Sequence, residues 1–442
     1  MDPEKVMKKE VLGCMVVIAS VFSCMMEKDL DKPKASEPYF ANTDRSFENE
    51  ISVVIQCETI GSHVYYTCDG SAPNGTNGSL YSEPFVLDAT TTVKAIAVSE
   101  NMADSQVCEA KFIKNPFLSW EVKASIDDEG ICINDIVIQN GILLCAYENV
   151  DDNEGGIEVF DVSALNEPKR ISTIKTSLGV ERLLLCGNTL YAAGADDNIN
   201  NNLSDLLVID VADWNAPSVL GRICLTGFPT SMQEKESVLF FVTMNWFGTS
   251  QLGRITAIET ADPSTPQIIG KIDIGKVPKG SFLDGNFFYS VYSYYASCCM
   301  QVVGVEDPKA MTHLENYKSA INWNIVGVKK YHDAACIAFT NYTEGFLEKT
   351  DLYDGGTITS QSIMTTQPAN AISICGDYIL LATDQKGVQI IEETGGSGFS
   401  EVGYIEYPGM GMGLCNNGNG IFVVTNEEVV ANGNHTLKIL GR

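Results

Sequence analysis

The segment GIEVFDVSALNEP at residues 156–168 is followed by two similar segments, DLLVIDVADWNAP at 205–217 and GRITAIETADPSTP at 253–266. Each begins as a run of apolar and β-branched residues, reaches an acidic residue and ends at a proline. This is the pattern of a β-strand that leads into a turn. The recurrence indicates that the second part of the chain, residues 115–442, is built from a repeated structural unit.

The repeat has a regular length. Its acidic residues Asp161, Asp210 and Glu259 are spaced 49 residues apart, and weaker copies lie at Val302–Pro308 and Gly387–Glu392. A period of about 40–50 residues that holds four short strands is typical of a β-propeller blade. We therefore expect each blade to run from an inner strand through a turn, a second strand, a long loop, a third strand and an Asp/Pro turn to an outer strand.

A second mark of the repeat is the turn before each second strand. The turns are Asn140-Gly141, Gly187-Asn188, Gly285-Asn286, Gly376-Asp377 and Asn417-Gly418, with weaker ones near Glu236 and at His332-Asp333. These marks predict seven blades, with six or eight as alternatives. The strand-end motifs resemble bacterial LVIVD-type propeller repeats, a family of mostly undefined biochemical role, so the resemblance implies a fold and a location more than an activity.

The last blade is short, because only three strands are predicted before the chain ends, at residues 410–415, 421–425 and 436–440. We expect the segment Trp120–Ile126, which precedes the first full repeat, to supply the missing outer strand. Closure of this kind leaves no free sheet edge where the first and last blades meet.

Residues 38–114 are predicted to form a small immunoglobulin-like β-sandwich, since strand-like runs alternate with turns every 8–12 residues or so. The expected strands are Ile51–Cys57, Val64–Cys68, Leu80–Phe85, Thr91–Val98 and Val107–Ile113. The segments Gly61–Pro73, Tyr81–Phe85 and Thr92–Ala97 resemble the C-terminal Ig-like domain of chitobiases and β-hexosaminidases. That resemblance implies a spacer or a weak glycan-binding accessory without catalytic residues.

The N-terminus resembles an export and anchoring signal. A lysine-containing start is followed by an apolar run, Val11–Phe22, which is too short to span a bilayer of about 30 Å. The run ends at Ser23-Cys24, so residues 1–24 are similar to a lipoprotein signal peptide with Cys24 as the lipidated residue. An ordinary signal peptide and a short membrane-associated helix are the alternatives. Residues 25–37 are polar and predict a flexible tether.

The charge of the chain excludes some partners. It has 57 acidic and 29 basic residues among 442, which gives a net charge of −28. Nucleic acid and anionic lipid surfaces both require a cationic face, so neither is expected as a partner of the whole surface. The only membrane contact expected is through the lipid anchor, and a monomer is expected. Four histidines, with no HExxH motif, make a histidine-built metal centre improbable.

The cysteines allow two interpretations. Cys186, Cys375 and Cys415 occupy one repeat-equivalent position in different blades, which is too far apart for a disulfide with Cα atoms within about 7 Å. Free thiols that pack as small hydrophobes are therefore expected in the propeller. A vicinal disulfide at Cys298-Cys299, and a bridge among Cys57, Cys68 and Cys108 in the sandwich, remain alternatives.

Two groups of loop residues are candidates for function, because the loops between second and third strands emerge on one face of a propeller, beside its channel. Acidic side chains could hold Ca²⁺ or could simply be solvated; these are Asp151, Asp152, Glu154, Asp196 and Asp197. Aromatic side chains could stack on sugars or anchor a peptide, or could pack between blades; these are Trp246, Phe247, Tyr292, Tyr294, Tyr295 and Tyr342.

Catalytic signatures are absent from the sequence, which has no GxSxG, no P-loop and no dinucleotide-binding fingerprint after a strand. No catalytic residue and no cofactor is assigned, apart from the candidate Ca²⁺. We expect an exported, lipid-anchored protein of the bacterial cell envelope, at the outer membrane or cell surface, whose propeller recognises a glycan, a peptide or a protein. The alternatives are a propeller hydrolase or lyase that acts on polysaccharide, with the sandwich as its carbohydrate-binding accessory, and a purely structural envelope protein.

Overall fold

The computed structural model describes residues 32–127, 131–149, 155–195, 203–247, 250–275, 277–294, 297–356, 358–365, 367–384, 386–394, 398–426 and 435–442. The chain divides into two units, Met1–Leu118 and Ser119–Arg442. The predicted signal peptide with Cys24, and most of the predicted tether, lie outside the described residues. Within the described residues, no helix combines the length and the apolar character that crossing a membrane requires.

The first unit is a small β-structure. Its main sheet has five strands in the order β2-β9-β8-β5-β6, and two further pairs are β1-β4 and β3-β7. The bounds are β1 (Tyr39–Phe40), β2 (Ser46–Phe47), β3 (Ile51–Val53), β4 (Ile55–Gln56), β5 (His63–Thr67), β6 (Ser79–Leu80), β7 (Phe85–Leu87), β8 (Thr91–Val98) and β9 (Cys108–Lys114). Val53, Val93 and Phe112 are fully buried in its core.

Two predicted strands of this unit are wrong. The segment Leu80–Phe85 is not continuous, because β6 ends at Leu80 and β7 begins only at Phe85. The run from Ile51 to Cys57 divides at Val54 into β3 and β4, because the two halves pair with different partners. Strand β3 pairs with β7, and β4 pairs with β1. A continuous β-branched run shows that a segment is extended, but it does not show which neighbour each half will find.

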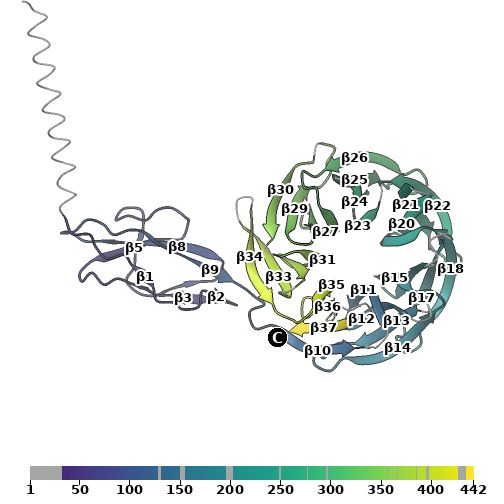
Figure 1. Ribbon diagram of the computed structural model, residues 1–442, viewed down its shortest axis with the longest axis horizontal. Helices are drawn as coiled ribbons and strands as arrows, with labels where there is room; N and C mark the ends of the chain where they lie inside the picture. The colour runs from purple at the N-terminus through teal and green to yellow at the C-terminus, as the bar shows by residue number, and fades with distance from the viewer. Residues whose placement is uncertain are drawn as a thin grey trace, which may run out of the picture. The chain divides into compact units, whose positions relative to one another are not determined.

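The described residues of the second unit form seven four-stranded sheets, which we call blades 1 to 7 in the order of their inner strands. In blades 1 to 6, consecutive strands of the chain are neighbours in the sheet, in the predicted order from inner to outer strand. Figure 1 shows the blades following one another around a common axis, as in a β-propeller.

The strand bounds of blades 1 to 3 are β11 (Ile131–Gln139), β12 (Ile142–Asn149), β13 (Gly155–Asp161) and β14 (Lys169–Thr176); β15 (Val180–Cys186), β16 (Thr189–Ala195), β17 (Leu203–Asp210) and β18 (Ser218–Thr226); and β19 (Phe228–Lys235), β20 (Val238–Phe247), β21 (Ser250–Glu259) and β22 (Gln267–Ile274). Those of blades 4 to 6 are β23 (Pro278–Asp284), β24 (Phe287–Tyr294), β25 (Ser297–Gly304) and β26 (Thr312–Lys318); β27 (Asn324–Tyr331), β28 (Ala334–Thr340), β29 (Gly345–Asp351) and β30 (Ser360–Thr365); and β31 (Ala369–Cys375), β32 (Tyr378–Thr383), β33 (Val388–Thr394) and β34 (Gly398–Ile405).

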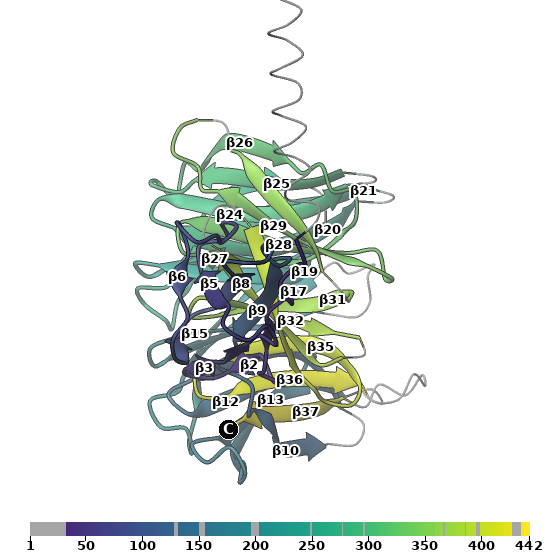
Figure 2. The same ribbon diagram turned by 90° about the vertical axis from the view of Figure 1, so that its left-hand side faces the viewer.

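Blade 7 joins the two ends of the propeller. It consists of β35 (Met410–Asn416), β36 (Ile421–Asn426), β37 (Thr436–Gly441) and, as its outer strand, β10 (Glu121–Asp127). Val122 pairs with Leu440, and Ile126 pairs with Leu437. Figure 2 shows β10 beside β37. This pairing confirms the predicted closure, in which the chain's last strand lies between its neighbour β36 and a strand from before the first repeat.

Apolar side chains of neighbouring blades pack against each other. Between blades 1 and 2, for example, Leu144 and Ile157 share one cluster with Leu183 and Leu190. The second strands are buried on both faces, and every residue of β28 is buried. A strand covered on both sides reads as a continuous apolar run, so its sequence lacks the alternation of a half-exposed strand.

All the cysteines in the described part of the chain are free thiols, including Cys298 and Cys299 and the three cysteines of the first unit. Cys186 and Cys375 end their inner strands, whereas Cys415 lies one residue before the end of β35. They belong to blades 2, 6 and 7, as the repeat predicts. Burial raises the pKa of Cys415 well above its ordinary value, which favours the neutral thiol.

Candidate functional site

The main cavity of the second unit is the central channel, with a volume of about 600 Å³. Residues from all seven inner strands line it. Each inner strand is the terminal strand of its sheet, so one edge of its backbone has no strand partner. The channel is therefore a polar space that combines unpaired backbone groups with side chains from every blade.

A β-bulge occurs at the same place in each inner strand, a few residues after the strand begins. The ladder skips one residue each time: Asn134, Glu181, Thr230, Lys279, Val326, Asn370 and Met412. A bulge re-aims the side chains near it. Inner strands begin on the face that carries the loops between second and third strands, since Ile131 lies opposite Asn149. The bulges therefore form a ring near the loop-bearing mouth of the channel.

Side chains tie each blade to the next, some near this ring and others, such as Lys330 and Tyr331, near the opposite ends of the inner strands. The links in order are Asp135 to the Leu183 amide, Arg182 to the Thr230 carbonyl, Ser231 to Ser281, Lys330 to Asp284, Tyr331 to the Asp377 carbonyl, Asn416 to Ser373, and His435 to the Ile133 amide. Partners in the first three links are 48 to 50 residues apart, which is the length of the repeat. These bonds fix the lining of the channel.

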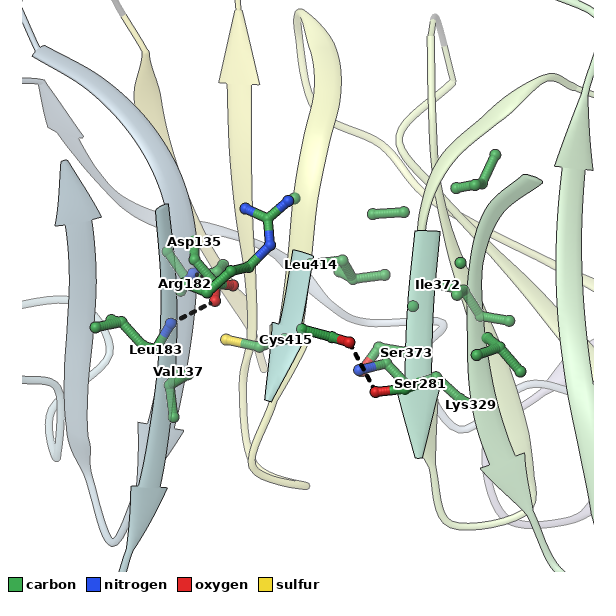
Figure 3. A pocket seen from close by; sticks show the side chains of 18 of the residues that line it. Asp135, Val137, Arg182, Leu183, Ser281, Lys329, Ile372, Ser373, Leu414 and Cys415 are labelled. Atoms are coloured by element: carbon green, nitrogen blue, oxygen red, sulfur yellow. Dashed lines mark hydrogen bonds between the residues drawn. The ribbon is translucent and has the colours of Figure 1, made fainter. Parts of the chain in front are cut away.

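Asp135 is the carboxylate of this lining. Its Oδ2 accepts the amide of Leu183 at 2.9 Å, and its Oδ1 accepts the amide of Ile136 at 3.0 Å. Burial raises the pKa of Asp135 above its ordinary value of 3.8, although Arg182, the two amides and Lys329 all act to lower it. Figure 3 shows Asp135 and Arg182 side by side, with the bond from Asp135 to Leu183. Lys329 reaches Asp135 electrostatically from blade 5, so charges from different blades share the channel.

The raised pKa makes a prediction for Asp135→Asn. When the pKa of a carboxyl is higher in the folded than in the unfolded protein, protonation of that carboxyl stabilises the fold. The whole of this contribution is present below the unfolded pKa of 3.8, and it is lost as the pH rises through the folded pKa. The wild type should therefore gain stability relative to Asp135→Asn as the pH falls from 7 to 4. Urea unfolding at several pH values measures this difference. The exposed carboxylate of Asp333 supplies the control Asp333→Asn, and a difference that is flat with pH would contradict the assignment.

Four of the six predicted aromatic residues lie on strands rather than on loops. Strand β20 extends to Phe247 and β24 extends to Tyr294, so Trp246, Phe247, Tyr292 and Tyr294 are strand residues rather than loop residues. Large aromatic side chains favour extended structure, and here they prolong the hairpins. The side chains of Trp246, Phe247 and Tyr294, and all of Tyr295, lie outside what the structure describes.

Tyr292 and Tyr342 have opposite environments. Tyr292 is half-buried, and a Cβ on Gly275 would lie 2.1 Å from its ring, so the ring covers this glycine. Burial, followed by the neighbouring Cys299, raises the pKa of Tyr292. Tyr342 is 75% exposed, with a φ of 72°, in a turn that the side chain of Asn341 closes onto the amides of Thr343 and Glu344. Of the predicted aromatic residues with described side chains, Tyr342 is therefore the one that the loop face presents to solvent.

The predicted acidic metal ligands, Asp151, Asp152, Glu154, Asp196 and Asp197, all lie outside the described residues. Among the residues that the structure does describe, no three His, Cys, Asp or Glu side chains are grouped to hold a metal ion. The calcium site stays a prediction.

Sequence reasoning missed the channel residues Asp135, Arg182, Lys279 and Lys329. The inner strands have no shared motif, so nothing singled these residues out individually. The signal that could have found them was the repeat itself. Alignment of the inner strands on their turns brings Asp135 and Arg182 to the same position, with Lys279 one residue farther from its turn and Lys329 two residues nearer to its turn.

Comparisons with known proteins agree with the fold. Residues 53–112 match the family model described as Fn3 associated. No curated protein matches the sequence. The WD40 β-propeller domain of Doa1 is similar to this chain with a TM-score of 0.51 and 10% identity, over 73% of this chain and 97% of that one. The β-propeller domain of Cps50 (Swd1) from Myceliophteria thermophila has the same score and identity, over 71% and 99%. At such identities the likeness shows the fold alone: the second unit is a β-propeller.

Proposed function

We propose that this chain is a non-catalytic recognition protein of the bacterial cell envelope, held to its membrane by a lipid on Cys24. In this proposal the propeller binds a glycan, a peptide or a protein partner at its loop-bearing face, and the first unit serves as spacer or accessory. The observation that carries the binding role is the channel of about 600 Å³, which falls within the size range of small-molecule sites. The blade-to-blade hydrogen bonds hold its lining in place before any ligand arrives.

The number of carboxylates in the channel favours a binding function over a hydrolytic one. A glycosidase generally needs two carboxyl groups across the scissile bond. Among the described lining residues, Asp135 is the only carboxylate, and both of its oxygens already accept backbone amides. The acid is therefore engaged in joining blades 1 and 2. We accordingly place the polysaccharide hydrolase or lyase second.

The proposal is tested by filling the channel. Ala371 lines the cavity at the position after the bulge, level with Asp135 and Arg182. Ala371→Trp should abolish binding of ligands found on glycan and peptide arrays, because the indole would occupy the channel. Val219→Trp, on the exposed outer strand β18, is the matched control and should bind as the wild type does. Equal binding by both variants would exclude the channel. Release of reducing sugars from polysaccharides would favour the hydrolase instead.

A further inference from the structure

The channel has a positive charge that the chain as a whole does not have. The net charge of the protein is −28, yet the cationic lining residues Arg182, Lys279, Lys329 and Lys330 face the single carboxylate Asp135 among the described lining residues. Lys330 forms an ion pair with Asp284. Three cations therefore remain, against one acid that is bound to backbone amides.

Two of these cations make no direct polar contact within the described structure. Lys279 and Lys329 are both exposed, and within the described structure neither ammonium group has a hydrogen-bond or ion-pair partner. Like charges that share a cavity repel each other, and low-dielectric walls strengthen that repulsion. Two lysines that share a cavity without a direct partner are explained by a negative group that comes from outside.

Arg182, which lines the same channel, is held rigidly. Its Nε donates to the carbonyl of Thr230 at 2.9 Å, and its Nη1 donates to the carbonyl of Asn134 at 3.4 Å. The guanidinium is thus fixed between neighbouring blades, while no bond is made by Nη2 within the described structure. Figure 3 shows this side chain beside Asp135, in the channel. A donor that is ordered beforehand loses little entropy when it meets an anion.

The rest of the described lining mixes hydroxyl and amide side chains with aliphatic ones, such as Ile136, Leu183 and Ile372. Ser231, Ser281, Ser373, Asn370 and Asn416 all contribute to it, and the described lining contains no Phe, Tyr or Trp. The hydroxyl and amide groups can exchange hydrogen bonds with the hydroxyls of a ligand.

We propose that the channel binds a small hydroxylated anion, such as a sugar that bears a carboxylate, phosphate or sulfate group. Lys279, Lys329 and Arg182 take the anionic group, and the serine and asparagine side chains take the hydroxyls. This inference rests on the proposed function, because it names the ligand class of the same channel. The anion site goes beyond the proposed function because it requires that recognition depend on the charge of the ligand.

Calorimetric titration of the full chain with glucuronate, glucose 6-phosphate and glucose 6-sulfate tests the proposal, with glucose as the neutral probe. At least one anion should bind, and glucose should not. The double variant Lys279→Gln/Lys329→Gln should bind that anion about tenfold more weakly, as expected for loss of charge-assisted hydrogen bonds. Lys271→Gln removes one exposed positive charge from outer strand β22 and should leave binding unchanged.

The outcomes separate the two proposals. Failure of all three anions to bind, or equal anion binding by the double variant and the wild type, would overturn the anion site. If a neutral glycan or a peptide still binds in a manner that Ala371→Trp blocks, the recognition role survives without the charge dependence. If the affinities of the three anions differ, their ranking identifies the preferred acid group.

Discussion

Replacing Leu437 with Ala is expected to lower the free energy of unfolding of the propeller by about 3 kcal/mol. Leu437 is fully buried in β37, where it pairs with Ile126 of β10 and Val424 of β36. It belongs to the cluster that joins blade 7 to blade 1. The substitution leaves a cavity at the seam between β10 and β37. The neighbouring side chains cannot move in to fill it, because the backbones of their strands are hydrogen-bonded into sheets.

Tryptophan fluorescence during urea unfolding is the measurement. All four tryptophans, Trp120, Trp214, Trp246 and Trp323, lie in the second unit, so the signal reports on the propeller and not on the first unit. Leu220→Ala on outer strand β18, where the leucine is 38% exposed, is the control and should change stability by about 0.5 kcal/mol or less. Equal effects of the two substitutions would mean that the seam is not a packed part of the propeller.

Much of this propeller is predictable from sequence because every blade packs between two neighbouring blades in the same way. A third strand such as β17 must present apolar residues to both neighbouring blades and then turn at Asp210, so the same pattern recurs with every blade. The closure by Trp120–Ile126 followed from counting, since three strands at the end of the chain needed a fourth. The observed strand β10 begins only one residue later, at Glu121.

The channel could not be predicted in the same way. Its bulge residues include Asn134, Lys279, Val326 and Met412, which share neither size nor charge. The bulge is set by the backbone geometry of strands crowded around an axis, so no residue type marks it. The positive charge of the channel could not be recognised in the sequence either, because the basic residues that produce it are dispersed over several blades of a strongly acidic chain.

Four of the predicted aromatic loop residues lie on strands, although a loop was expected wherever the repeat was long. In blade 3 the ladder continues until Phe247 pairs with Ser250. The aromatic residues there extend a hairpin, and length alone did not distinguish a longer hairpin from a longer loop. The loop prediction is correct for Tyr342, because its sequence neighbours Asn341 and Thr343 favour turns.

Gly387→Ala is expected to lower the free energy of unfolding by at least about 3 kcal/mol, because two costs add at this position. The φ of Gly387 is 94°, a conformation that residues with a Cβ rarely adopt. In addition, a Cβ here would lie 2.0 Å from the carbonyl oxygen of Ile405. That oxygen belongs to β34, which pairs with β33 through Val388, so neither backbone can move without breaking the ladder of blade 6.

Gly418→Ala separates the two costs. Gly418 has a similar φ of 82°, but a Cβ there would meet no atom within 4 Å. Its substitution should cost only about 1–2 kcal/mol, the conformational part alone. The difference between the two variants in urea unfolding, again followed by tryptophan fluorescence, then measures the steric part. Because Thr383 donates two hydrogen bonds to the carbonyl of Gly387, relief by movement of this turn would itself break bonds. Equal losses of stability in the two variants would therefore show that β33 and β34 do not approach each other as closely as the structure has them.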